Sequence, residues 1–351
     1  MTAYVTRPAV ALPPHRVTTA EIAADLDRAQ AGHPDLRLAR RMTRSLRVQE
    51  RYFARPLTQY AQPESIAERH RWTAAALYRL GERAARDALE EAGTAPDAVD
   101  CMITLHTTAV DMPGLGVHVA NTLGLRPDVL HVPVSQIGCA GGAWALAHAA
   151  ELVAARSRRR VLVLAAEVLS TSYRPEDPGQ VPAMYRALFG DGAAACVVSG
   201  EWLGPGLGIQ DGWTYLLPHS ADRYRKMETD EGPRFASTRA AVNAVAECMP
   251  SLVGWLREAG ESAWPQWTAV HPGGPRIIES VAAGLGLDSE ALRTAWDSLR
   301  AQGNPGGPAV LDVLRRTYDD PPADGSPGLL CGWGPGFAGA AVRGLWCAEP
   351  R

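Results

Sequence analysis

The chain has 351 residues, of which 46% are hydrophobic and 21% charged, and its formal net charge is −3. This composition is ordinary for a globular enzyme, and the length allows a large core and two domain-sized halves. The charge balance gives no reason to expect a nucleic-acid or membrane partner. No apolar run has the ~18 residues of a membrane span, no segment resembles a signal peptide, and the cysteines lack metal-like spacing. We therefore expect a cytoplasmic enzyme without a bound metal.

The N-terminal part predicts a short strand, a capped helix and a basic helix. Residues 3–12 contain the strand-like apolar stretch. Thr18 is followed three residues later by Glu21, which is the spacing of a capping box. Seven arginines then recur at spacings of three and four, which places most of them on one side of a helix: Arg37, Arg40, Arg41, Arg44, Arg47, Arg51 and Arg55. Such a face is most often simply solvated.

The middle of the chain alternates between apolar strands and helices. Helical patterns cover residues 72–92 and 143–155, and apolar strand-like runs cover residues 99–105, 129–134, 160–168 and 193–198. Residues 173–185 read as a loop. Continuous apolar strands that alternate with helices indicate a parallel sheet covered on both faces, and hence an α/β fold.

The second half repeats this alternation less regularly. A strand is expected at about residues 207–217, then an irregular polar segment up to Gly232 and a helix at about residues 236–257. A strand at 267–270, helices at 276–283 and 289–299 and a final hairpin within 328–346 complete the pattern. Each half contains a polar residue at a glycine-rich turn, followed by a helix and an apolar strand, which suggests two similar halves.

Cys139 is the first candidate for chemistry. It follows a strand and precedes an Ala- and Leu-rich helix, with Gly138, Gly141 and Gly142 around it. Free N–H groups and the helix dipole favour a thiolate at such a position, which predicts a pKa below the usual ~8.5 of a cysteine. A buried, inert thiol is the alternative on local context alone.

His271 and Asn304 strengthen the case for Cys139. His271 follows an apolar run and opens the segment His-Pro-Gly-Gly-Pro, and Asn304 lies in a glycine-rich turn before a helix. Cysteine, histidine and asparagine at the ends of separate elements are the parts of an activated-thiol site. Taken singly, His271 reads as a satisfied loop histidine and Asn304 as a helix cap.

At these motifs the sequence resembles the type III polyketide synthases of the chalcone and stilbene synthase superfamily. The matching segments are the Cys139 turn, 271–275, 303–304, the Leu-Phe-Gly-Asp-Gly run at 188–192, the Val-Asp-Met-Pro-Gly run at 110–114, and Gly-Trp-Gly-Pro-Gly at 332–336. The resemblance implies a thiolase-like fold with two βαβ-type halves in a layered αβαβα core. Residues 1–200 would carry the nucleophile and the arginines that bind coenzyme A, and residues 201–351 the histidine and asparagine.

The resemblance also implies roles for individual residues. Cys139, His271 and Asn304 would be catalytic, with His271 holding the thiolate as an ion pair. The expected cavity residues are Phe189, Phe235, Thr107, Thr108, Met112, Leu169, Ser172, Tyr185 and Gly306. Arg41, Arg44 and Arg276 would bind coenzyme A, and Met112 would reach across the interface of a homodimer. Without the resemblance, Phe189 and Met112 read as core residues.

The implied reaction loads an acyl-CoA starter on Cys139 and extends it by decarboxylative condensation with a malonyl-CoA-type extender. Cyclisation to an aromatic ring or pyrone would follow, and no cofactor is required beyond the coenzyme A thioesters themselves. Two alternatives remain: a ketosynthase III-like enzyme that makes one condensation, and a non-catalytic partner protein with the same fold. Leu169 and Tyr185 are bulkier than the residues of chalcone-forming members, whereas Gly306 replaces a frequent serine, so we expect a different cavity and no flavonoid product.

Overall fold

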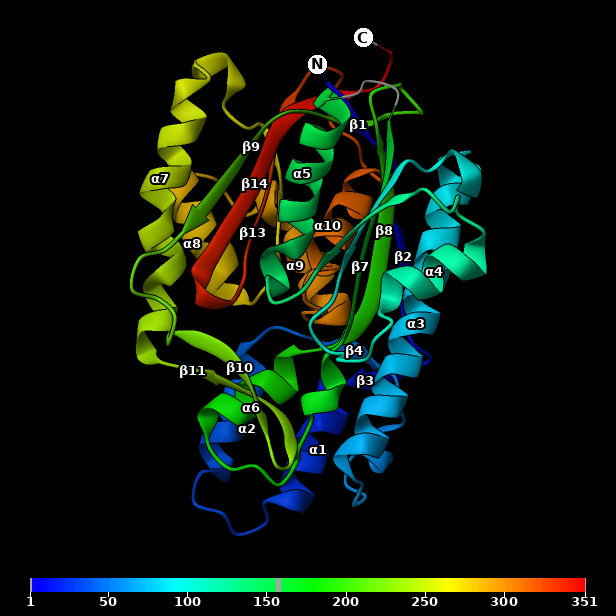
Figure 1. Ribbon diagram of the computed structural model, residues 1–351. Helices are drawn as coiled ribbons and strands as arrows, with labels where there is room; N and C mark the ends of the chain where they lie inside the picture. Colours follow the sequence, from blue (N-terminus) through cyan, green and yellow to red (C-terminus); the bar gives the residue numbers. More distant parts are fainter. Residues whose placement is uncertain (1, 156–158, 351) are drawn as a thin grey trace.

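The computed structural model describes residues 2–155 and 159–350, and within them a ten-stranded sheet forms the centre of the protein (Figure 1). The strand order is β12-β13-β14-β9-β1-β8-β7-β5-β6, and β2 also pairs with β8. The strands are β1 (Ala3–Val5), β2 (Ala9–Ala11), β5 (Cys101–Leu105), β6 (Leu130–Val134), β7 (Arg160–Val168), β8 (Asp191–Ser199), β9 (Gly206–Leu216), β12 (Trp267–Val270), β13 (Pro327–Trp333) and β14 (Ala338–Cys347).

The sheet is mixed, so the expectation of a parallel sheet is only partly correct. β5 is parallel to β6 and β7, and β12 is parallel to β13, but β7 pairs with β8 in the antiparallel direction. The segment between β7 and β8 contains α6 (Gln180–Leu188), where the sequence predicts a loop. Both β7 and β8 are buried along nearly their whole length, which explains their continuous apolar character.

Helices form layers on and between the strands. α5 (Gly141–Ala155) packs against interior strands from both halves of the sheet, including β7 and β14, and against α10 (Ala309–Thr317). On the outside, α3 (Ile66–Glu91) and α4 (Leu115–Leu123) lie on the side of β7 and β8, and α7 (Ala244–Glu258) and α8 (Pro275–Leu285) on the side of β9 (Figure 1). α9 (Arg293–Gln302) packs beside α10. This layered architecture is the expected thiolase-like α/β fold.

A glycine permits the close approach of the two inner helices. A Cβ atom at Gly142 would lie 2.6 Å from both the Gly307 carbonyl oxygen and Val310 Cγ1. Any side chain at this position would therefore push α5 away from α10. The predicted domain boundary near residue 200 falls between β8 and β9. Both strands pair with β1 in the same sheet. The division into two domains therefore stays a prediction.

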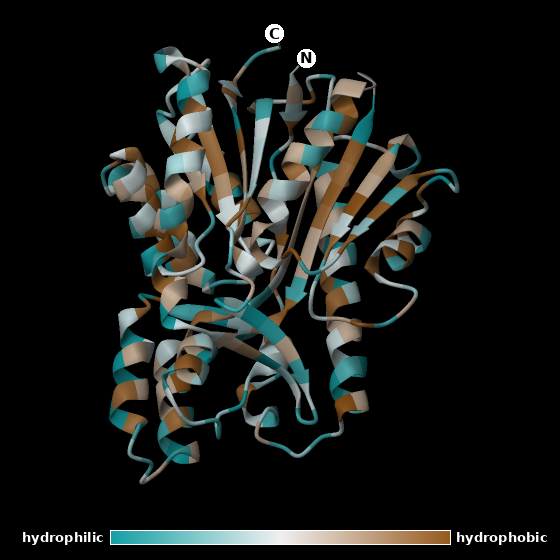
Figure 2. Ribbon diagram, turned by 60° about the vertical axis from the view of Figure 1, so that its left-hand side comes forward, coloured by the Kyte–Doolittle hydropathy of each residue, from teal (hydrophilic) through white to brown (hydrophobic). Residues whose placement is uncertain are grey.

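A smaller region lies at one end of the sheet and contains two short antiparallel pairs. β3 (His15–Thr18) pairs with β4 (Glu50–Phe53) near α1 (Thr19–Ala29) and α2 (Leu36–Ser45), and β10 (Tyr224–Thr229) pairs with β11 (Gly232–Ser237). The polar segment before Gly232 is therefore a strand, and the following α-helix begins at Ala244. In Figure 2 this hairpin is mostly hydrophilic, whereas the strands of the large sheet are mostly hydrophobic. A half-exposed hairpin lacks the apolar run that identifies a buried strand.

The predicted N-terminal helix start is confirmed, and the predicted basic helix exists but is shorter than the arginine series. Thr18 caps α1 and exchanges hydrogen bonds with Glu21 as a capping box. α2 ends at Ser45, so the last three arginines of the series lie outside it, and Arg51 is fully buried on β4. Among the described residues, no helix is both long enough and apolar enough to span a bilayer.

Candidate active site

Cys139 lies where β6 leads into the inner helix. It occupies a single 3-10 turn, Gly138–Ala140, directly before α5, and only 8% of its surface is exposed. Gly138 has a φ of +54°, and a Cβ there would lie 2.6 Å from Pro335 Cδ. The predicted strand-turn-helix position of the cysteine is confirmed.

Asn304 places its carboxamide beside the sulfur. The Asn304 Nδ2 atom lies 3.8 Å from Cys139 Sγ. The orientation of the side chain is fixed because Oδ1 accepts a hydrogen bond from the Gly306 N–H at 2.8 Å, and the Asn304 N–H donates to the Leu188 carbonyl at 2.8 Å. The N-cap of α10 is Pro308, so Asn304 is not a helix cap.

His271 follows β12 and is completely buried. Its backbone N–H donates a hydrogen bond to the Cys331 carbonyl at 2.8 Å. Neither nitrogen of its imidazole ring has a hydrogen-bond partner among the described residues. A satisfied loop histidine is therefore excluded. His271 lines one cavity of about 190 Å³ together with Cys139 and Asn304. Gly332 makes room between them, because a Cβ there would lie 3.2 Å from both the Cys139 carbonyl oxygen and His271 Cβ.

The electrostatic setting corrects one expectation. Burial raises the pKa of Cys139 to about 12, against a smaller opposing effect of the Asn304 hydrogen bond. Burial also lowers the pKa of His271 to about 3. The predicted lowering of the cysteine pKa is therefore wrong for the resting site, because loss of water outweighs the helix terminus and favours a neutral thiol beside a neutral imidazole.

Three packed aromatic rings lie at the junction of this cavity and its neighbours. Tyr185 and Phe189 line it, and their ring centroids lie 5.0 Å apart in a stacked arrangement. Phe235, from β11, meets Phe189 edge to face at 4.9 Å and lies 5.5 Å from Tyr185. We call Tyr185, Phe189 and Phe235 the aromatic wall.

A larger cavity of about 1120 Å³ reaches Cys139 from another side. It includes several of the predicted cavity residues: Thr107, Met112, Leu169, Phe235 and Gly306. Thr108 is not among its lining residues; its buried hydroxyl accepts a hydrogen bond from the Val168 N–H at 3.0 Å. Ser172 lies elsewhere, in a third cavity on the other side of the aromatic wall.

Glu167 and Lys226 are charged residues of the large cavity that the sequence analysis did not select. The buried Glu167 carboxylate accepts hydrogen bonds from the Thr107 N–H at 3.1 Å and the Thr107 hydroxyl at 2.9 Å, yet burial raises its pKa to about 7. Lys226, the only lysine of the chain, donates to the Thr107 carbonyl at 2.8 Å and pairs with Glu228 at 2.8 Å. Glu167 lies in the otherwise apolar strand at 160–168, and a carboxylate in such a strand could have indicated a functional residue.

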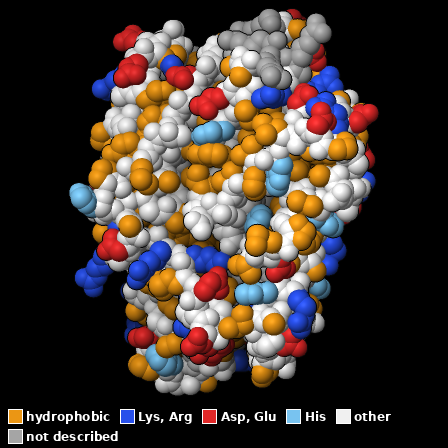
Figure 3. All heavy atoms as spheres, in the orientation of Figure 1, with side chains coloured by type: hydrophobic (Ala, Val, Ile, Leu, Met, Phe, Trp, Pro, Cys, Tyr) orange, Lys and Arg blue, Asp and Glu red, His pale blue; other side chains and the backbone are white. Residues whose placement is uncertain are grey.

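The mouth of the large cavity carries exposed apolar side chains. Met112 is 94% exposed, and Val110 and Val117 beside it are also exposed. Hydrophobic side chains gather over the middle of the face shown in Figure 3. Large exposed apolar groups at a cavity mouth are typical of a surface that another chain covers.

The three arginines predicted to bind coenzyme A differ in position. Arg276 lines the cavity that holds Cys139, whereas Arg41 and Arg44 are exposed on α2. Arg47, which the sequence analysis did not select, lies 3.9 Å from Glu279, and Arg276 lies 3.8 Å from the same carboxylate group. The segment that follows α2 therefore approaches the start of α8 near the cavity.

Comparison with known proteins agrees with this geometry. The profile of chalcone and stilbene synthases, N-terminal domain, matches residues 39–201. The chain is 30% identical to phloroglucinol synthase of Pseudomonas fluorescens (97% of this chain, 98% of that one) and 31% identical to 1,3,6,8-tetrahydroxynaphthalene synthase of Streptomyces griseus (99% and 94%). It superimposes on germicidin synthase of Streptomyces coelicolor, a type III polyketide synthase, with a TM-score of 0.93 and 32% identity over 99% of this chain and 100% of that one. The chain therefore belongs to the type III polyketide synthases of the chalcone and stilbene synthase family, and is a condensing acyltransferase.

Proposed function

We propose that Cys139 carries the growing acyl chain and that His271 and Asn304 serve both the loading and the condensation steps. One observation carries this proposal: the three side chains come from distant segments and line the same cavity, with Asn304 Nδ2 3.8 Å from the sulfur. The substrates are an acyl-CoA starter and a malonyl-CoA-type extender.

In the loading step, Cys139 Sγ attacks the thioester carbonyl of the starter while its proton passes to His271. The new bond joins Sγ to the acyl carbon, and the bond between that carbon and the coenzyme A sulfur breaks. The coenzyme A sulfur takes the proton back from His271 and leaves as the free thiol, so the imidazole is neutral again. Because both groups are neutral at rest, His271 acts as a general base rather than as a permanent cation.

In the condensation step, the extender loses carbon dioxide and its thioester carbonyl becomes an enolate. His271 and Asn304 Nδ2 donate hydrogen bonds to that oxygen, where the negative charge develops. The enolate carbon attacks the acyl carbonyl, a C–C bond forms and the bond to Cys139 Sγ breaks. The product is a β-ketoacyl-CoA that is two carbons longer. These steps require only the coenzyme A thioesters.

The large cavity suits repeated extension and folding of the chain before cyclisation. Its volume of about 1120 Å³ exceeds what one short acyl group fills. The exposed Met112 at its mouth supports assembly as a homodimer in which each protomer closes the cavity of its partner.

Covalent labelling tests the role of Cys139. We expect radiolabelled acyl-CoA to label the wild-type protein and a Cys101→Ala control, because Cys101 is a buried thiol on β5 outside these cavities. Cys139→Ala should remain unlabelled, and retained label would overturn the proposal. Mass spectrometry of products from a panel of starters with malonyl-CoA then gives the number of extensions, and a single extension would favour the ketosynthase III-like alternative.

A further inference from the structure

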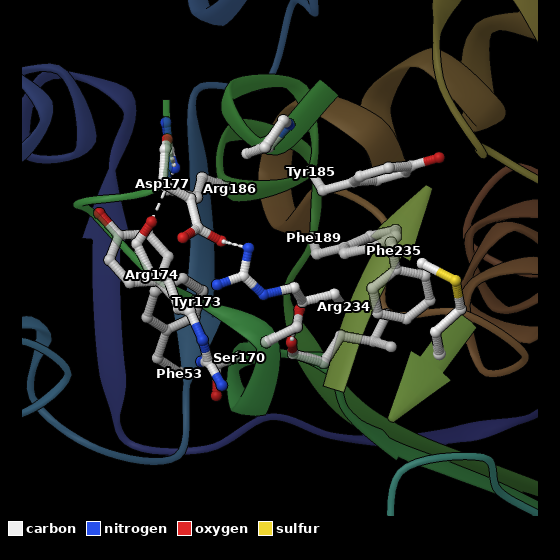
Figure 4. A pocket seen from close by; sticks show the side chains of 14 residues that line it. Phe53, Ser170, Tyr173, Arg174, Asp177, Tyr185, Arg186, Phe189, Arg234 and Phe235 are labelled. Carbon is white, nitrogen blue, oxygen red and sulfur yellow. Dashed lines mark hydrogen bonds and ion pairs between the residues drawn. The ribbon is translucent and has the colours of Figure 1, made fainter. Parts of the chain in front are cut away.

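A third cavity of about 130 Å³ lies behind the aromatic wall (Figure 4). Tyr185 and Phe189 line both this cavity and the one that holds Cys139, and Leu169 and Phe235 line both this cavity and the large one. A single layer of side chains therefore separates it from the space around the sulfur.

The side of this cavity away from the wall is strongly cationic. Arg174, Arg186 and Arg234 line it against one carboxylate, Asp177. Figure 4 shows the rings of the aromatic wall on one side of the pocket and Asp177 on the other, with Arg234 reaching towards Asp177. Arg234 pairs with Asp177 at 3.1 Å and also with Glu231 at the surface, so the one acidic group of the lining is already engaged.

Arg174 leaves two of its donor atoms without a hydrogen-bond partner among the described residues. Its surface is only 4% exposed, and the two atoms are Nη1 and Nη2. Burial is the largest cause of the lowered pKa of Arg174. Charges of both signs surround it: Arg69 and Arg234 lower the pKa further, whereas Asp177 and Glu176 raise it. Arg69 itself pairs with Glu64 at 3.0 Å.

Arg186 supports the same cationic face. Its Nη1 atom donates to the carbonyls of Arg174 and Asp177, each at 2.7 Å, and so fixes the segment that presents Arg174. Its Nη2 atom has no partner among the described residues. A buried guanidinium stays charged, and leaving its donors unpaired is costly, so such groups normally hold an anion.

We propose that this cavity, lined by Arg174, Arg186 and Arg234, is a carboxylate-binding site. A guanidinium fork matches a carboxylate in two parallel hydrogen bonds. The volume corresponds to about four water molecules at ~30 Å³ each, which admits the end of a short acyl chain or a small dicarboxylate but not coenzyme A. Small rotations of Leu169 and Phe235 would join it to the large cavity, where the far end of an acyl group on Cys139 lies.

The carboxylate has two possible sources, and the test separates them. It belongs either to the distal end of an acyl group on Cys139, a reading that rests on the proposed function, or to a free dicarboxylate that enters past the partly exposed Arg234. The variants are Arg174→Gln and Arg234→Gln, and Arg234 remains informative if the buried Arg174 variant misfolds. Arg126→Gln is a matched control, since Arg126 and Arg234 side chains are both 35% exposed and each faces two carboxylates.

The first arm measures binding of free glutarate by calorimetry, without turnover. A free-ligand site predicts saturable binding to the wild type and the Arg126→Gln control, and binding at least tenfold weaker in the two cavity variants. The second arm compares adipoyl-CoA with hexanoyl-CoA, two six-carbon starters that differ by the terminal carboxylate, in extension with malonyl-CoA.

In the second arm, an acyl-end site predicts that the kcat/KM ratio of adipoyl-CoA to hexanoyl-CoA falls at least tenfold in the cavity variants, while hexanoyl-CoA turnover stays within twofold. The Arg126→Gln control should leave the ratio unchanged. The proposal is overturned if neither glutarate binding nor the starter ratio depends on Arg174 or Arg234. Failure of the wild type to extend either starter would instead count against the proposed function, and the glutarate arm would still decide the carboxylate site.

Discussion

The Asn304 carboxamide faces Cys139 Sγ with both of its ends, Nδ2 at 3.8 Å and Oδ1 at 3.9 Å, and Oδ1 also accepts a hydrogen bond from the Gly306 N–H at 2.8 Å. Asn304→Asp keeps an acceptor for Gly306 but loses the donor, whereas Asn304→Ala loses both. We expect kcat/KM for malonyl-CoA decarboxylation to fall about 100-fold or more in both variants, since one oxyanion donor contributes ~3 kcal/mol. Thermal melting should show a clear loss of stability only for Asn304→Ala. Near-normal decarboxylation by Asn304→Asp would show that the donor is dispensable.

Alkylation of Cys139 should depend steeply on pH. Burial raises the pKa of this thiol to about 12 and lowers that of His271 to about 3, so the thiolate is a minor form at neutral pH. Below the thiol pKa, the thiolate fraction grows tenfold for each pH unit. The rate of inactivation by iodoacetamide should therefore rise continuously from pH 6 to pH 9. A rate that is already constant across this range would reveal a preformed ion pair with His271.

Glu167 should make the free energy of unfolding depend on pH. Burial raises the pKa of this carboxyl from 4.5 to about 7, so the folded state holds the proton more tightly than the unfolded state. The protonated form stabilises the folded state fully below pH 4.5, and this stabilisation is lost as the pH rises to about 7. The free energy of unfolding should fall by roughly 3 kcal/mol over this range.

A glutamine cannot ionise, so Glu167→Gln tests this directly. Urea unfolding at a series of pH values should show the variant gaining stability relative to the wild type between pH 4.5 and 7, with a constant difference above that range. Glu201→Gln, which changes a carboxylate of which 47% is exposed, serves as the control and should show no such trend. A flat difference for Glu167→Gln would contradict the raised pKa.

Tyr185 should limit the size of the starter. Its ring stacks on Phe189 at 5.0 Å and lies 5.8 Å from the ring of Tyr224, so it fills space next to the sulfur. We expect the wild type to form no chalcone from 4-coumaroyl-CoA and malonyl-CoA, and Tyr185→Ala to load the coumaroyl group onto Cys139. The variant should lose ~3 kcal/mol of stability because of the space left behind.

Mass spectrometry of the intact acyl-enzyme would measure this loading. The control is Tyr215→Ala. The Tyr215 ring stacks on Trp213 with 5.7 Å between the ring centroids, and it does not line these cavities. Efficient chalcone formation by the wild type would show that Tyr185 does not restrict the cavity.

The sequence predicts best the features that depend on neighbouring residues. The Cys139 turn and the capping box at Thr18 are local arrangements of glycine, hydroxyl and carboxylate groups, and both are observed. The family resemblance adds His271 and Asn304, which the structure brings into one cavity with Cys139.

Features that depend on distant contacts were less accessible. The pKa of Cys139 follows from burial beneath segments near residues 271, 304 and 334, which local sequence does not reveal. The β10–β11 hairpin is polar because it is partly exposed, so it lacked a strand signal. The residues that line the arginine-lined cavity are spread along the chain from Phe53 to Phe235, so no local sequence pattern predicts this cavity.

The solitary amine at Lys226 makes the interior of this enzyme observable by spectroscopy. Because the chain has no second lysine, reductive methylation with carbon-13 formaldehyde would add one side-chain NMR resonance, distinct from that of the terminal amine. That resonance would originate beside Thr107 and Glu228, at the lining of the large cavity, and would shift whenever an intermediate enters. Successive chain lengths could then be followed in real time without any substitution in the chain.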